Sequence, residues 1–218
     1  MFEDPVTAGC MIGSLIHLLP YTPSTPSSYL TSFVASTDGS PFEGECAYDP
    51  ASMWCFSRTP GPLSSTSLPL SPLFAPSPTS SSLLIVSNVT TATIGVVKLS
   101  HDSPADLSVT LEEVIVQPTF QDTLHEVEAV YLTLDRLFAL GYRRVEARVD
   151  GGDVANKSFF EKIGFHWDGT AAKATLYELE GGDVVSSNAE IYSVLNSDWK
   201  VSLLSVREGI EGWFSDDI

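Results

Sequence analysis

Residues 124–167 switch between helical and strand-like periodicity, and this order constrains the fold more than any other feature of the 218-residue chain. Leu124 to Leu140 carries its apolar residues at the spacing of one helical face. Gly141 follows, where a left-handed cap can end a helix, and Arg143 to Val149 then alternates apolar and charged residues like a half-buried strand. A second short helix ends at Gly164, and another strand can begin directly after it. The order predicts helices that connect strands of one sheet.

Three strand-like stretches precede this run. LLIV begins at Leu83, IGVVKL begins at Ile94, and SVTLEEVIV extends from Ser108 to Val116. A turn at residues 88–93 and a loop at residues 102–106 separate them. Together with the helices that follow, these strands predict an α/β fold, an α+β sandwich built on a mixed sheet.

Composition divides the chain into three zones. Residues 1–37 contain a candidate short helix from Ser27 to Ala35. Residues 38–82 are rich in Ser, Pro and Gly, and no charged residue lies between Arg58 and Lys98. Such a stretch buries too little apolar surface to offset its ordering entropy, so we expect an insertion that is a loop or disordered. Residues 83–218 are expected to form the core.

The formal net charge of −17 argues against nucleic acids and anionic membrane surfaces as partners, because both would be repelled. No apolar run reaches the roughly 20 residues that span a bilayer, and Met11 to Leu19 is too short for a convincing leader, so we expect a cytoplasmic protein. Most of the eleven Lys and Arg residues fall between Arg136 and Lys173. These cations either hold an anionic ligand there or pair with neighbouring carboxylates on solvated faces.

Neither the cysteines nor the histidines have the spacing of metal ligands, so no metal site is expected. The number of cysteines is odd, which gives no support for a disulfide framework. Each histidine is expected to be a surface or hydrogen-bonded residue, and His125 alone would lie near a candidate ligand turn. The residues concerned are Cys10, Cys46, Cys55, His17, His101, His125 and His166.

The segment EEVIVQPTFQDTLHEVEA begins at Glu112, and LGYRRVEARVD begins at Leu140, with the EKIGF helix end beyond it. Both segments resemble the GNAT superfamily of N-acetyltransferases, and in particular the branch of ribosomal-protein-alanine acetyltransferases. Weaker similarity lies in LPYTP and YSVLNSDW. The resemblance implies a mostly antiparallel central sheet with helices on both faces, in which two parallel strands splay apart. It also implies acetyl-coenzyme A (acetyl-CoA) as cosubstrate, held between those strands.

On this resemblance the coenzyme arm pairs with the backbone of the Thr110 to Gln117 strand, and the pyrophosphate lies on amides at the next helix N-terminus. The family's glycine-rich turn is replaced by Gln121, Asp122 and Thr123. An acid beside a pyrophosphate is unfavourable unless it turns away or caps the helix, and both Asp122 and Thr123 are N-cap candidates. The residues that the resemblance assigns to coenzyme binding are Val114, Ile115, Val116, Gln121, Asp122, Thr123, Leu124, His125, Glu126, Asp153, Asn156 and Phe160.

Glu112 and Glu113 are the candidates for a general base, and because strand side chains alternate, only one of them faces the split. The resemblance favours Glu113, while the alternative is that both are surface charges. Phe160 stands where many relatives carry a tyrosine that protonates the departing thiolate, and a phenyl ring cannot donate a proton. Ser158 is a substitute acid, or else a plain surface hydroxyl.

Two function classes follow. The first is an acetyl-CoA-dependent transferase that acts on an amine of a small molecule or a protein N-terminus. The second is a protein of the same fold that binds a ligand or performs a different reaction. Relatives carry a further strand ahead of LPYTP. If that strand is missing here, a sheet edge is left uncovered, and residues 38–82 or a second subunit in a homodimer are the candidates to cover it.

Overall fold

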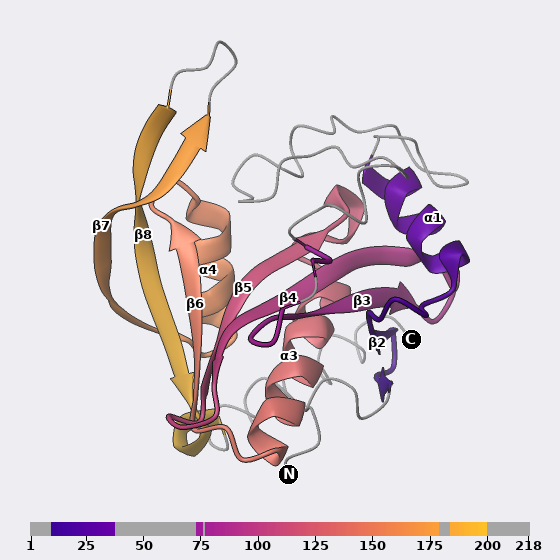
Figure 1. Cartoon of the computed structure of the whole chain (residues 1–218), viewed down its shortest axis with the longest axis horizontal. Coiled ribbons are helices and arrows are strands. Elements are labelled where there is room, and N and C mark those ends of the chain that lie inside the picture. Colours follow the sequence, from indigo (N-terminus) through magenta and orange to yellow (C-terminus); the bar gives the residue numbers. More distant parts are fainter. Residues whose placement is uncertain (1–9, 38–72, 76, 179–183, 200–218) are drawn as a thin grey trace, which may run out of the picture. The chain divides into compact units, whose positions relative to one another are not determined.

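The computed structural model describes residues 10–37, 73–75, 77–178 and 184–199 (Figure 1). Their strands form one eight-stranded sheet in the order β1-β2-β3-β4-β5-β6-β8-β7. The strands are β1 (Met11–Ile12), β2 (Ile16–Pro20), β3 (Ser81–Ser87), β4 (Thr93–Ser103), β5 (Ser108–Val116), β6 (Arg144–Asp150), β7 (His166–Glu178) and β8 (Val184–Leu195). The helices are α1 (Ser27–Thr37), the 3-10 turn η2 (Pro118–Phe120), α3 (Leu124–Ala139) and α4 (Val154–Lys162). The predicted mixed α/β fold is confirmed, and no described helix has the length and apolar character to span a membrane.

The chain divides into two compact units, and the division cuts β4 after Asp102 and β5 after Thr110. Of the described residues, those up to residue 102 and residues 111–140 belong to the first unit, and residues 103–110 and those from 141 onward belong to the second. Within the second unit, the amide of Arg143 donates to the carbonyl of Leu107 at 2.7 Å, just ahead of β6 and β5 respectively. Both strands start from this point, so β5 and β6 are the parallel pair of an otherwise antiparallel sheet. The splaying of this pair further along stays a prediction.

Both faces of the sheet in the first unit are buried. Phe33 of α1 packs on one face, against Leu84, Val86 and other residues of the same cluster. Leu83 and Ile85 alternate with these side chains, so they point to the opposite face, and both are fully buried. The helix α3 lies against β1 and β2 and buries the apolar stripe Ala129, Val130 and Leu134.

The N-terminal zone contains a hairpin that periodicity did not reveal, because β1 is only 2 residues long and the sequence IHLLP of β2 does not alternate regularly. The strands β1 and β2 pair antiparallel, and β2 continues the sheet by pairing with β3. The candidate helix of this zone is confirmed as α1. Leu73 and Phe74, which fall in the predicted insertion, are buried in the cluster of Phe33. The predicted loop or disorder of residues 38–72 lies outside the described residues.

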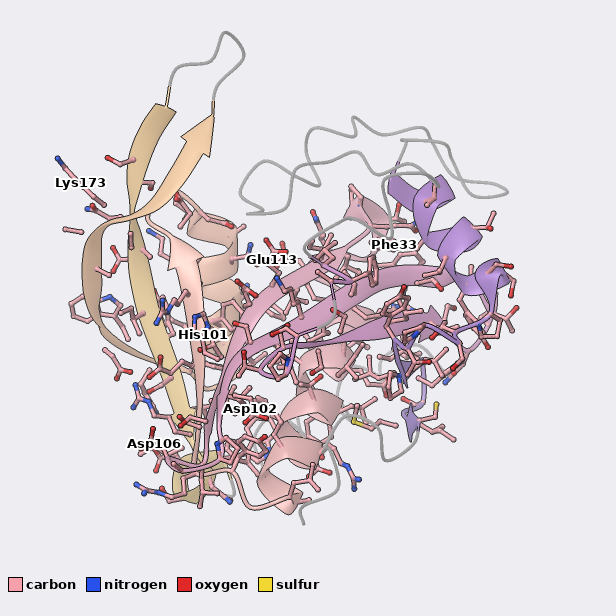
Figure 2. The ribbon with its side chains drawn as sticks, in the orientation of Figure 1. Phe33, His101, Asp102, Asp106, Glu113 and Lys173 are labelled. Atoms are coloured by element: carbon pink, nitrogen blue, oxygen red, sulfur yellow. The ribbon has the colours of Figure 1, made fainter. Side chains whose placement is uncertain are left out.

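The second unit is built on β6, with β8 paired antiparallel beside it and β7 beyond β8. The hydroxyl of Tyr192 on β8 donates to Glu161 of α4 at 3.2 Å, which ties the helix to the sheet. The register of β7 shifts twice, between Trp167 and Gly169 and again between Ala171 and Thr175. Lys173 lies in the second irregularity at a φ of 53°, and its side chain extends into solvent (Figure 2).

Candidate functional site

The turn between β5 and α3 is fastened to the end of β5. The amide of Gln117 donates to Ile94 of β4 at 2.9 Å, and the carbonyl of Gln117 accepts from Phe120 at 2.8 Å. The side-chain amide of Gln121 then crosses the turn and donates to the carbonyl of Val116 at 3.2 Å. Because these bonds hold the turn at both ends, the N-terminus of α3 is fixed close to the last residues of β5.

Thr123 is the N-cap of α3, which confirms one of the two predicted caps. Its hydroxyl oxygen accepts from the amide of His125 at 3.3 Å, and Glu126 reaches back to accept from the amide of Asp122 at 2.7 Å. This is a capping-box arrangement in which the glutamate bonds one residue further upstream than usual. Within the part of the chain that the structure describes, the amides of Thr123 and Leu124 have no acceptor. They are oriented for an anion by the helix dipole.

Asp122 does not cap the helix. Its backbone has a φ of 53°, in the left-handed region, and its side chain is exposed. The conformation releases the amide of Asp122 toward Glu126 and leaves the carboxylate in solvent. Asp122 would therefore disfavour a bound pyrophosphate through its nearby negative charge, and its side chain would not block the turn.

The imidazole of His125 lies against the ring of Phe120, with a centroid distance of 4.9 Å, and near the hydroxyl of Thr123 at 3.4 Å. Burial lowers the pKa of His125, while the negative charge of Glu128 acts in the opposite direction. The first residues of α3 therefore present a neutral imidazole near neutral pH, so the anion-binding capacity of the turn rests on amides and the helix dipole.

The two glutamates of β5 have different surroundings. Glu112 forms an ion pair with Lys98 of β4 at 2.8 Å. Glu113 is only 9% exposed, and strand alternation places it on the same face as Ile115, whose side chain belongs to the core cluster of Phe33 (Figure 2). The structure thus separates the two candidates for a general base, with Glu113 the more deeply buried.

In the second unit, Asp153 caps α4. Its carboxylate accepts from the amide of Asn156 at 3.0 Å and from the side-chain amide of Asn156 at 2.5 Å. Phe160 is buried in a cluster of aromatic rings. Its ring centroid lies 5.0 Å from that of Phe165 and 5.5 Å from that of Phe159. Ser158 is half-buried. Asp153, Asn156 and Phe160 thus have clear structural roles. A coenzyme contact at these three residues, and a role for Ser158 as an acid, stay predictions.

The predicted residues are therefore distributed over two units. The first unit brings together the end of β5, the turn and the start of α3, and it holds Glu113, Val114, Ile115, Val116, Gln121, Asp122, Thr123, Leu124, His125 and Glu126. The second unit holds Asp153, Asn156, Ser158 and Phe160. No group of three or more potential metal ligands occurs among the described residues, and Cys10 is the one cysteine that falls within them.

Two buried polar residues of the first unit were not identified from the sequence. Gln117 is 1% exposed, and both polar atoms of its side chain lack a hydrogen-bond partner. Glu128 accepts from the amides of Ser14, Leu15 and Ile16 and from the hydroxyl of Ser14. The available signals were a polar residue at the apolar end of a strand and an acid four residues after Leu124 on an apolar helical face.

No protein-family model matches the chain, and no curated protein matches it in sequence. Solved structures do match its fold. A GCN5-related N-acetyltransferase from Brucella melitensis has a TM-score of 0.77 at 16% identity, over 98% of this chain and 87% of that chain. A GNAT-family structure from Chromobacterium violaceum ATCC 12472 has a TM-score of 0.70 at 21% identity, over 88% of each chain. The spermidine/spermine N-acetyltransferase SpeG from Vibrio cholerae has a TM-score of 0.54 at 12% identity, over 85% of this chain and 95% of that chain.

These likenesses define the class of the molecule by its architecture: the chain has the fold of the GNAT acetyltransferases. At such identities a structural match shows the fold and leaves the reaction to be argued from the site. The narrower similarity to the ribosomal-protein-alanine branch rests on the sequence segments alone.

Proposed function

We propose that the chain is an acetyl-CoA-dependent N-acetyltransferase that transfers the acetyl group to an amine of a small molecule or a protein N-terminus. The observation that carries the proposal is the start of α3, where the amides of Thr123 and Leu124 have no acceptor among the described residues. These amides lie at the end of the turn that follows β5, in a fold shared with N-acetyltransferases. A helix N-terminus of this kind is suited to a pyrophosphate.

The proposed roles follow from the positions of the residues. The amides of Thr123 and Leu124 hold the pyrophosphate, and the backbone of residues 114–116 in β5 pairs with the pantetheine arm. When bound, the coenzyme supplies an acetyl thioester. The acceptor amine forms a bond to the thioester carbon as the carbon–sulfur bond breaks, so a proton must leave the nitrogen and one must reach the sulfur.

Glu113 is the proposed base for the amine proton, directly or through a water. Its burial on the α1 face of β5 keeps it apart from bulk solvent, whereas the carboxylate of Glu112 is committed to Lys98. Phe160 has no proton to donate, so Ser158 or solvent is the proposed source of the proton for the thiolate.

A cationic acceptor fits the electrostatics of the chain best. The net charge of −17 attracts cations over a distance of about a Debye length, roughly 8–10 Å at physiological ionic strength. SpeG from Vibrio cholerae, which shares the fold, acts on the polycations spermidine and spermine, as its name states. A polyamine or another amine with several positive charges is therefore the first acceptor to test.

A protein of this fold that binds a ligand without acetyl transfer is the second candidate. It is favoured by the exposed acid at Asp122 and by the phenyl ring at Phe160, since neither assists the transfer. Binding of coenzyme A tests whether the protein holds the proposed ligand. Formation of an acetylated product distinguishes the transferase from a protein that binds without acetyl transfer.

The first experiment measures the melting temperature of the protein with coenzyme A at sub-millimolar concentration. A rise in the melting temperature is expected, because a ligand that binds only the folded state stabilises it. Acetyl-CoA and spermidine are then combined with the protein, and mass spectrometry should detect acetylated spermidine. Coenzyme A that leaves the melting temperature unchanged at saturating concentration contradicts the proposal, and binding without product favours the second candidate.

The second experiment compares Glu113→Gln with its neighbour variant Glu112→Gln. Loss of a general base lowers turnover by about 100-fold or more, so Glu113→Gln should lose activity and keep its affinity for coenzyme A. Glu112→Gln breaks the ion pair with Lys98 and should retain turnover within about threefold. Full turnover in Glu113→Gln rules out the proposed base.

A further inference from the structure

One buried side chain of the first unit has polar atoms that the fold leaves without hydrogen bonds. Gln117 is 1% exposed, and both its Nε2 and its Oε1 lack a hydrogen-bond partner. Burying an amide without partners costs free energy, so native proteins nearly always satisfy such groups. Two other buried polar groups of the first unit follow that rule: Glu128 accepts four hydrogen bonds, and the hydroxyl of Thr133 donates to Ala129.

Both backbone polar groups of Gln117 are hydrogen-bonded, so its side chain is the part of the residue that lacks partners. The amide of Gln117 donates to Ile94 and its carbonyl accepts from Phe120. Gln117 also lies between the last residue of β5 and the first residue of the turn, next to the carbonyl of Val116 that accepts from Gln121. The unpartnered amide is thus at the junction of the two segments that the proposed function assigns to the coenzyme.

We propose that the side chain of Gln117 is a coenzyme-recognition group that hydrogen-bonds to the pantetheine arm. The assignment rests on the proposed function and adds a residue to it. A primary amide needs both an acceptor for its Nε2 hydrogens and a donor for its Oε1. Pantetheine offers both kinds of group, through its amides and its hydroxyl.

The chemistry of the other parts of the reaction fits less well. Phosphate oxygens accept hydrogen bonds and would leave Oε1 unfilled, and a protonated amine donates and would leave Nε2 unfilled. A secondary amide or hydroxyl can fill the donor and the acceptor together. The adenine edge also offers a donor and an acceptor, but Gln117 directly follows β5, whose backbone is proposed to pair with the pantetheine arm, so the arm is the part of the coenzyme assigned to Gln117.

The test compares Gln117→Met with Thr133→Val. Methionine has nearly the length and volume of glutamine and forms no strong hydrogen bond. Thr133→Val removes a buried hydroxyl that is already bonded and lies outside the proposed site. Calorimetry measures the affinities for coenzyme A, pantetheine and adenosine 3′,5′-bisphosphate, and the urea midpoint measures the stability of each unliganded protein.

Gln117→Met should be at least as stable as the wild-type protein without ligand, because it removes an unpartnered amide. Its affinity for coenzyme A and for pantetheine should fall about tenfold, and its affinity for the bisphosphate should be unchanged. Thr133→Val should lower the urea midpoint and leave all three affinities unchanged.

Lower stability of unliganded Gln117→Met with unchanged affinities would show that a structural water satisfies the amide, and the assignment would be overturned. An equal loss of affinity for pantetheine and the bisphosphate would overturn the assignment too, because the substitution would then weaken binding of the whole coenzyme and not contacts to the pantetheine arm alone. If the wild-type protein itself does not bind coenzyme A, the proposed function fails first. If Gln117→Met does not fold, Gln117→Asn keeps the amide, withdraws it by one methylene and should show the same loss for pantetheine.

Discussion

The carboxylate of Glu128 joins the N-terminal hairpin to α3. Four donors from the bend between β1 and β2 point to its two oxygens, at distances of 2.7 to 2.9 Å. Gly13 contributes to this arrangement, because a Cβ at that position would meet the carboxylate carbon at 2.5 Å. One helical side chain thus takes the place of backbone pairing for three successive residues, and the hairpin depends on it.

Glu128→Gln should lower the free energy of unfolding by about 2–4 kcal/mol, because an amide group carries no charge and directs hydrogens at donors. Urea denaturation measures the change. Asp135→Asn, an exposed acid on the same helix, is the matched control and should stay within about 0.5 kcal/mol of the wild-type protein. A loss no larger than that of the control would contradict the role of Glu128 as the anchor of the hairpin.

His125 should make stability depend on pH in a defined direction. Burial, opposed by Glu128, lowers its pKa in the folded protein, so the unfolded chain takes up the proton first as the pH falls. The stabilisation is complete above the unfolded value of about 6.5 and is lost as the pH falls through the folded pKa. The urea midpoint of the wild-type protein minus that of His125→Gln should therefore decrease from about pH 7.5 to about pH 5.5. If this difference between the urea midpoints stays constant or increases as the pH falls, protonation of His125 does not destabilise the folded protein.

At the scale of elements, the turn that precedes α3 combines a left-handed residue, a threonine cap and a glutamate that reaches back. Asp122 tolerates its φ of 53° better than most residues, but its charge lies beside the amides proposed to bind a pyrophosphate. The conformation of Asp122 therefore suits the turn, whereas its negative charge disfavours the binding of a pyrophosphate there.

Asp122→Gly should raise the affinity for coenzyme A by about three- to tenfold, since glycine keeps the left-handed conformation and removes the charge. Asp122→Asn separates the two effects, because it also loses the charge and retains a side chain. Both variants should gain affinity in calorimetric titrations. Two unchanged affinities would place the pyrophosphate away from this turn.

Local patterns were sufficient to predict the elements that surround the turn. The strand predicted for Ser108 to Val116 is β5, and the helix predicted for Leu124 to Leu140 is α3, one residue shorter. The hairpin of β1 and β2 was not predicted, because its strands are defined by their pairing with each other and, for β2, with β3, and not by alternation. Only the start of β7 was predicted, since its later register shifts follow from its pairing with β8.

The candidate site was predictable to a smaller extent. The cap at Thr123 follows from residue type and position, and the structure confirms it. Whether Glu113 acts as a base stays a prediction, although its burial and the ion pair of Glu112 favour it over its neighbour. The unpartnered amide of Gln117 was not predictable, because burial and the lack of a partner depend on residues distant in sequence.

At the scale of the whole molecule, the dominant physical property is charge. The chain has 28 Asp and Glu residues and 11 Lys and Arg residues, which give the net charge of −17. Repulsion among like charges disfavours a compact state, and dissolved salt screens it. The same charge underlies the proposed preference for a cationic acceptor.

Sodium chloride should therefore raise the melting temperature by a few degrees between about 10 and 150 mM and little beyond, because the Debye length is already about 8 Å at the upper concentration. Differential scanning calorimetry across this range measures the effect. A rise that continues in proportion to concentration would point to surface exclusion of salt and not to screening. A fall would show that the charges are arranged in net attraction.

The edge strand β7 has a consequence for self-association. A long straight border strand can template the addition of further chains, and such stacking leads to fibrils. The two register shifts and the positive charge of Lys173 interrupt this edge strand. An incoming strand would therefore find few consecutive backbone donors and acceptors along it. When acid neutralises the carboxylates and mutual repulsion weakens, we expect this interrupted edge to limit the growth of ordered aggregates.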